Sequence, residues 1–196
     1  MEMKYFAPLP MEEQLHCRRV AAVSKLIAEA RGFSTIEAEA IEQAAMFHDV
    51  GKSVIPAEFL NKSGELTTRE RDIVMSHTTM GKRLLDGTES ILSTAAIVAF
   101  QHHEYLDGSG YFGLFDKAIH PHSKLVTVAD IFDKLMFCRL GGEKEKLEST
   151  CGTLLQYADK KLDSRTVLTL LANLDQALVV CHVVNVNAYN PANAHS

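Results

Sequence analysis

The stretch HHEYLDGSGYFG, at residues 102–113, places two histidines and a glutamate directly before a glycine-rich loop. Neighbouring histidines are uncommon in a protein core, because every buried ring nitrogen needs a hydrogen-bond partner there. A bound metal ion satisfies the same nitrogens. The stretch therefore raises the possibility of a metal site, to which other parts of the chain would contribute.

Further ligand-type side chains fall on the apolar faces of the expected helices. His48 follows Ile41 and Ala45 at helical spacing, and His102 extends the stripe of Ala95 and Val98. A lone histidine of this kind is usually a core residue bonded to a carbonyl, but a buried carboxylate without a partner is costly. Divalent metal ions would satisfy all of the ligand-type side chains that are expected to point into the core. These are His16, His48, Asp49, His77, His102, His103 and Asp130.

Glu12 joins these candidates, because it lies four residues before His16 and therefore on the same helical face. The competing interpretation is an ordinary acid that the dipole of the helix favours near its N-terminus. Both interpretations stay open from the sequence alone.

The chemistry of the donors indicates the kind of metal. Imidazole and carboxylate groups without thiolates argue against structural zinc and favour iron, manganese or a similar metal. Asp49, Asp130 and Glu12 bring three negative charges, which favours more than one divalent ion. We expect Asp49 to bridge two ions, because the two oxygens of a carboxylate point apart.

The helices that must position these donors are indicated by apolar residues recurring at intervals of three and four. Ser34 with Glu37 and Thr67 with Glu70 form capping boxes that mark two helix starts. The chain is predicted to be all-α, with helices near 11–31, 35–48, 68–76, 78–86, 89–104, 123–138, 144–161 and 164–182.

We expect a single domain over residues 1–196, with a core at about 11–140 and a C-terminal helical hairpin at about 144–182. Residues 105–122 form the one long irregular loop. The polar residues 185–196 are expected to be a frayed tail.

Two glycines, Gly32 and Gly51, are expected to end the helices that precede them.

Composition excludes several classes of function. The net charge of −5 implies no general attraction to DNA or to an anionic membrane. The N-terminus lacks a signal-peptide pattern, and the most apolar segment, 167–184, is too polar and too short to span a bilayer. The four cysteines show no CxxC spacing, so we expect core thiols in a reducing cytoplasm.

At HDVGK, residues 48–52, the chain resembles the HD phosphohydrolase superfamily, and HHEYLDGSGYFG is similar to the HHExxDGxGYP motif of its HD-GYP branch. The resemblance extends over roughly residues 12–175. It implies an all-helical HD-domain bundle with two or three metal ions, held by Glu12, His16, His48, Asp49, His77, His102, His103 and Asp130.

The resemblance also implies hydrolysis of cyclic di-GMP or a related cyclic dinucleotide by a metal-bound hydroxide. Asp49 and Lys52 would be catalytic, and Lys52, Tyr111 and Arg139 would contact the substrate. Signalling proteins are the partners that such a protein implies. The chain shows no receiver or membrane sensor segment, so we expect a stand-alone effector or a part of a longer protein.

The sequence departs from the family pattern on the substrate side. Phe112 stands where the family has proline, which would leave the loop freer, and Gly142 stands where the family has a basic residue. Two alternatives to the phosphodiesterase stay open, and these departures motivate the first of them. One is a cyclic-dinucleotide sensor or interaction module with little turnover. The other is a different HD-domain reaction on nucleotides, or iron-dependent oxygenation.

Overall fold

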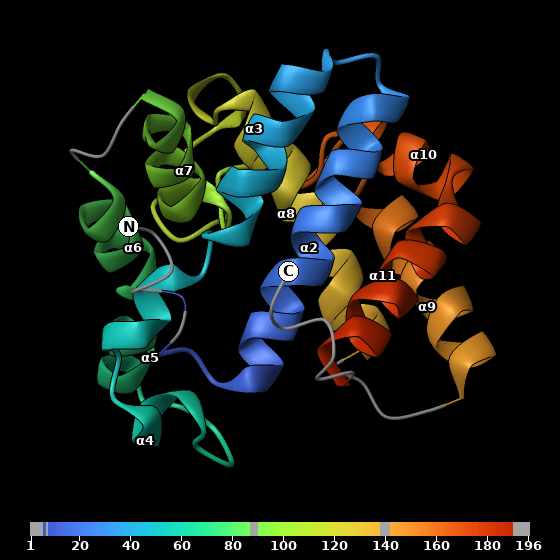
Figure 1. Cartoon of the computed structure of the whole chain (residues 1–196). Coiled ribbons are helices and arrows are strands. Elements are labelled where there is room, and N and C mark those ends of the chain that lie inside the picture. Colours follow the sequence, from blue (N-terminus) through green and yellow to red (C-terminus); the bar gives the residue numbers. More distant parts are fainter. Residues whose placement is uncertain (1–5, 7, 87–89, 138–141, 190–196) are drawn as a thin grey trace.

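A computed structural model describes residue 6 and residues 8–86, 90–137 and 142–189 (Figure 1). Within these residues the chain is helical and has no strand, only isolated bridges such as Asp107 with Phe115. The all-α class expected from the sequence is confirmed. The elements are α2 (Met11–Ala30), α3 (Thr35–Met46), η1 (Val50–Val54), α4 (Ala57–Leu60), α5 (Thr68–Met75), α6 (His77–Leu85), α7 (Ser90–Gln101), η2 (Asp116–Ala118), α8 (Pro121–Phe137), α9 (Glu143–Tyr157), α10 (Ser164–Ala172) and α11 (Leu174–Tyr189).

Helix α2 is the central helix of the bundle and packs against α3, α8 and α11 (Figure 1). Its inner face buries apolar residues such as Val20, Val23 and Ile27. The helix ends as expected at Gly32, whose φ of 82° lets the N–H groups of Gly32 and Phe33 bond to Glu29 and Ala28. His16 is one of the buried residues of this helix.

The predicted capping boxes are both present. Ser34 accepts the Glu37 N–H at the start of α3, and Thr67 accepts the Glu70 N–H at the start of α5. Each glutamate side chain also accepts the backbone N–H of its capping residue. These contacts fix the starts of the two helices that precede His48 and His77 in the chain.

Gly51 does not end a helix, and this expectation was wrong. Helix α3 already ends at Met46, with Phe47 as its C-cap, and Gly51 lies in η1. A Cβ on Gly51 would lie 1.9 Å from the carbonyl oxygen of His77. Glycine is required here because η1 and α6 touch backbone to backbone, which holds Asp49 beside His77.

The C-terminal part consists of α9, α10 and α11, drawn in orange and red in Figure 1. The helix expected over 164–182 is divided at Asn173, whose side chain bonds back to the Thr169 carbonyl. Residues 185–189 continue α11 rather than fraying, because that helix packs on α2. No single described helix is long and apolar enough to cross a membrane; α10 and α11 meet that test only as a pair bent by 77°.

The cysteines within the described residues are free thiols, as expected. Cys17 and Cys181 are buried in the core, and Cys151 is half-buried. Cys138 lies outside the described residues.

Candidate metal centre

The fold brings together side chains from five separate segments. His16 comes from α2, Asp130 from α8, and His77 is the first residue of α6. The turn after α3 supplies His48 and Asp49, and the residues directly after α7 supply His102 and His103. Two groups of possible metal ligands result, and Asp49 belongs to both.

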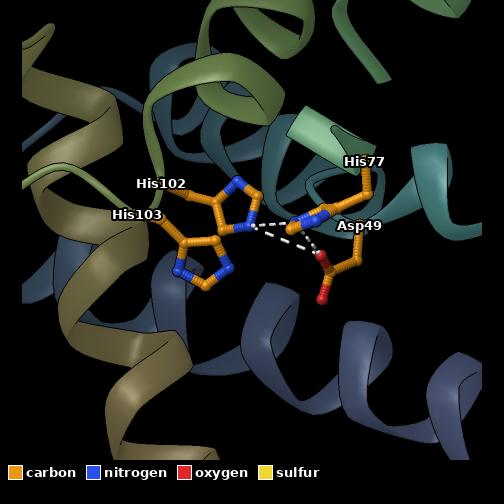
Figure 2. A group of neighbouring side chains, drawn as sticks. All are labelled: Asp49, His77, His102 and His103. Carbon is orange, nitrogen blue, oxygen red and sulfur yellow. Dashed lines mark hydrogen bonds and ion pairs between the residues drawn. The ribbon is translucent and has the colours of Figure 1, made fainter. Parts of the chain in front are cut away.

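The first group is Asp49, His77, His102 and His103 (Figure 2). Oδ1 of Asp49 lies 3.1 Å from Nε2 of His77 and 3.4 Å from Nε2 of His102. The two Nε2 atoms are 3.4 Å apart. All four ligand atoms, including one from His103, lie within 4.8 Å of one another.

The second group is His16, His48 and Asp49, with Asp130 beside it. Oδ2 of Asp49 lies 3.1 Å from Nε2 of His48 and 3.7 Å from Nε2 of His16. Oδ1 of Asp130 lies 3.1 Å from the same nitrogen of His16. Asp49 thus turns one oxygen to each group.

These separations match those between ligands of one ion. Two atoms about 2.1 Å from a metal are about 3.0 Å apart at a right angle and about 3.4 Å apart at a tetrahedral angle. Several donor pairs fall in this interval without being hydrogen-bonded to each other, including His16 with Asp130. The spacing is that of ligands around a shared cation.

The tautomers of the imidazoles support the same conclusion. The Nδ1–H groups of His48 and His77 donate to the carbonyls of Ala45 and Val74, each at 2.7 Å. His102 donates similarly to the Ala99 carbonyl at 3.0 Å. A carbonyl only accepts hydrogen bonds, so each Nε2 is left with its lone pair toward the cluster.

Several buried polar atoms at the centre have no hydrogen-bond partner among the described residues. They are Nε2 of His16, Nε2 of His48, Oδ1 of Asp49 and Oδ1 of Asp130. Buried polar atoms of native proteins are nearly always satisfied, and lone pairs facing one another need a cation. The donor set therefore fits divalent metal ions.

Burial and charge set the protonation of the donors. Burial lowers the pKa of His102 to about 4 and also lowers the pKa of His103, which favours neutral imidazoles. Burial alone would raise the pKa of Asp49, but Lys52 and His48 hold that pKa well below its usual range. His102, His103 and Asp49 are thus in the forms that bind metal.

His16 is the exception. Burial lowers its pKa, but the carboxylates of Asp130, Asp133 and Asp49 outweigh burial and raise the pKa well above the usual value. The carboxylates therefore hold positive charge at this end of the cluster, and either a proton or a metal ion supplies it.

A second layer of contacts orients His16. Its Nδ1 lies 2.7 Å from Oδ2 of Asp133, and Arg19 donates to both oxygens of Asp133 at 2.6 and 2.9 Å. Arg19 also donates to Asn185 of α11 at 3.0 Å. Asp133 thus orients His16, and Arg19 and Asn185, which were not anticipated, extend this support to α11.

A cavity of about 690 Å³ opens beside the second group. Lys52 enters it from η1 and donates to Asp49 Oδ2 and Glu13 Oε1, each at 2.8 Å. Lys134 enters it from α8. The cavity is lined by Glu12, Glu13, Leu15, His16, Arg19, Lys52, Lys134, Phe137 and Asn185.

Tyr111 covers the first group from the long loop. Its ring lies 4.5 Å from the ring of His103 and 6.3 Å from that of His77, between centroids. The loop is anchored by buried Glu104, which accepts the N–H groups of Phe112 and Leu114 at 2.8 Å. Phe112 also stacks on Phe100 at 4.5 Å, so the expectation of a freer loop was wrong.

One predicted ligand lies outside the two donor groups. Glu12 has an exposed side chain at the rim of the cavity and belongs to neither group of donors, so its role as a ligand stays a prediction. Arg139 lies outside the described residues. Lys134 was missed, although its position four residues after Asp130 is a signal that an acidic ligand has a helical neighbour.

The helical bundle and the paired donor groups define the class, an all-helical protein with a buried site able to bind metal ions. The family model of the HD domain matches residues 4–166. The chain therefore belongs to the HD-domain family.

Among curated relatives, the chain is similar to the cyclic di-GMP phosphodiesterase response regulator RpfG of Xanthomonas campestris pv. campestris. The two are 36% identical over 165 residues, which are 83% of this chain and 44% of the relative. It is also 30% identical, over 171 residues, to the 3'3'-cGAMP-specific phosphodiesterase 2 of Vibrio cholerae, covering 86% of this chain and 33% of the relative. The chain thus spans less than half of the length of these relatives.

Among solved structures, the chain resembles Bd1817, described as an HDG"Y"P protein from Bdellovibrio bacteriovorus. The TM-score is 0.66 and the identity 20%, over 82% of this chain and 51% of the other. This likeness confirms the all-helical fold.

Proposed function

We propose that this chain is a metal-dependent phosphodiesterase that hydrolyses cyclic di-GMP or a related cyclic dinucleotide. The observation that carries the proposal is Asp49, which turns one oxygen to each of two histidine groups. A bridging carboxylate of this kind suits two ions that clamp one phosphate between them. The names of the relatives support a cyclic dinucleotide as the substrate class.

We propose two divalent ions, iron or manganese, as the cofactors. His77, His102, His103 and Asp49 would hold one ion, and His16, His48, Asp49 and Asp130 the other. Imidazole with carboxylate suits these metals. When bound, such ions neutralise phosphate charge and lower the pKa of water toward neutrality.

The protein's own groups would then place the substrate. The Lys52 ammonium is held by Asp49 and Glu13 and lines the cavity, from which it would donate to a phosphate oxygen. The Tyr111 ring, packed on His103, would cover the opposite end of the substrate. Phosphate oxygens would lie between these two side chains, against the donors.

The test is incubation of iron-loaded or manganese-loaded protein with cyclic di-GMP, cyclic GMP-AMP and cyclic di-AMP, with linear and mononucleotide products separated by chromatography. We expect product with at least one pair of metal and substrate. If none forms with any metal while calorimetry shows binding, the protein is a sensor, the second candidate. Gly142 favours that candidate, because the N-cap of α9 has no side chain where the family pattern has a cation.

A further inference from the structure

Lys134 lies at the mouth of the donor cluster, and the family motifs assign it no role. Its ammonium group donates to Oδ2 of Asp130 at 2.8 Å, while Oδ1 of the same carboxylate faces His16. The side chain remains 37% exposed. It therefore touches a proposed ligand and reaches the solvent-filled cavity at the same time.

The position of Lys134 parallels that of Lys52. Lys52 donates to the Oδ2 atom of Asp49, and Lys134 donates to the Oδ2 atom of Asp130. These are the two carboxylates of the second donor group, and both lysines line the same cavity with His16. Two ammonium groups thus border this group, one from η1 and one from α8.

We propose that Lys134 binds a phosphate group of the substrate together with Lys52, an inference that rests on the proposed function. An ammonium group has three N–H donors, and Asp130 takes one of them. The remaining donors can reach an anion in the cavity. Lys134 supplies from α8 a positive charge that Gly142 does not supply at the start of α9.

The acidic residues around the cavity disfavour the binding of an anion, and a lysine there reduces this repulsion. Glu12 and Glu13 line the cavity beside Asp49 and Asp130, and these acids repel a phosphodiester. Lys134 offsets one of these charges at the edge where substrate would enter. A charge-assisted hydrogen bond from an ammonium group to phosphate adds directional binding.

The competing role is a lysine that only fixes the orientation of Asp130. Lys82 provides a control, because it too pairs with an aspartate at a spacing of four, although that aspartate follows the lysine in the chain, whereas Asp130 precedes Lys134. Its ammonium lies 2.9 Å from Asp86 Oδ2, its side chain is 42% exposed, and it does not line the cavity. Removing either lysine deletes one lysine–aspartate ion pair, but only the pair of Lys134 borders the cavity.

The experiment uses the full chain loaded with manganese, and its metal content is checked by elemental analysis. Calorimetry with inorganic phosphate compares the wild type with Lys134→Met, Lys134→Arg and Lys82→Met. We expect Lys134→Met to bind phosphate at least about tenfold more weakly with unchanged metal content, because it loses a charged hydrogen bond. Lys134→Arg should stay within about threefold of the wild type, and Lys82→Met should equal it.

Three results would overturn the proposal: phosphate affinity unchanged in Lys134→Met, no phosphate binding by the wild type, or loss of metal in parallel with loss of affinity. The last result would assign Lys134 to the positioning of Asp130. Hydrolysis of cyclic dinucleotides is measured separately, and there Lys134→Met should raise KM and leave kcat near that of the wild type. Absence of hydrolysis in the wild type counts against the phosphodiesterase, whereas the phosphate titration still decides the role of Lys134.

Discussion

The backbone N–H of Phe112 donates to Oε1 of Glu104 at 2.8 Å, which ties the loop carrying Tyr111 to a buried carboxylate. The other oxygen of Glu104 accepts the N–H of Leu114. A proline at 112, as in the family pattern, has no N–H to donate. This chain therefore fixes its loop with a contact that the usual motif excludes.

Replacing Phe112→Pro should leave Oε1 of Glu104 without this partner and cost about 1–3 kcal/mol of unfolding free energy. Urea denaturation measures the loss, and KM for the cyclic dinucleotide should rise as Tyr111 moves. Phe112→Leu is the control, because it keeps the N–H and loses only the stacking on Phe100. Equal stability of the two variants would contradict the role of the hydrogen bond.

Asp49→Ala should remove both metal ions together, since one oxygen of Asp49 faces each donor group. Elemental analysis after anaerobic purification would show metal content near zero, and turnover should be lost with it. Asp86→Ala, at an exposed helical ion pair, should leave the metal content unchanged. One retained ion per chain would show that Asp49 serves a single metal and does not bridge.

Gly51→Ala should be strongly destabilising, by roughly 3 kcal/mol or more, because overpacking at a backbone contact forces the chain to shift. The added Cβ would meet the His77 carbonyl at 1.9 Å. Metal affinity should fall as well, because a shift of η1 away from α6 would move Asp49 away from His77. Gly152→Ala on α9, where a Cβ meets nothing within 4 Å, should instead stabilise by about 0.5–1 kcal/mol. Thermal unfolding of the two variants compares them, and similar melting temperatures would refute the steric argument.

Tyr111→Phe should leave the metal content unchanged and lower kcat/KM for the cyclic dinucleotide. The phenyl ring keeps its packing on His103, so only the hydroxyl group is lost. We expect unchanged metal content and stability, with a several-fold fall in kcat/KM, of the size of one hydrogen bond of about 1 kcal/mol. Tyr105→Phe tests a tyrosine near Lys161 instead and should leave kcat/KM as in the wild type. A loss of metal in Tyr111→Phe would mean that the hydroxyl supports the donors.

The candidate donors could be selected from the sequence because each lies on or beside an otherwise apolar helical stripe. Five histidines stand out as polar residues at these apolar positions. In the structure they lie together in two groups of possible ligands: His16, His48, His77, His102 and His103. Glu12 shows the limit of the method. Sharing a helical face with His16 places it on the correct side of α2, but the first turn of that helix lies at the cavity rim.

The helices were predictable where a local signal existed, as at the capping boxes of α3 and α5. Gly51 and Asn173 were misjudged because their roles depend on neighbours distant in sequence or on a single side-chain bond. Lys134 was missed for a related reason. A lysine four residues after an acid resembles a surface ion pair, and only tertiary structure shows that the acid faces a histidine cluster.

The contact between Arg19 and Asn185 extends the site beyond its signature motifs. The match to the HD-domain family stops at residue 166, yet the chain of hydrogen bonds from His16 through Asp133 and Arg19 finishes on α11. A protein truncated where the family match stops would keep every proposed ligand. It would lose Asn185, which accepts a hydrogen bond from the Arg19 side chain that holds Asp133 beside His16. A shortened version of this protein should therefore retain α11, although the family match does not include that helix.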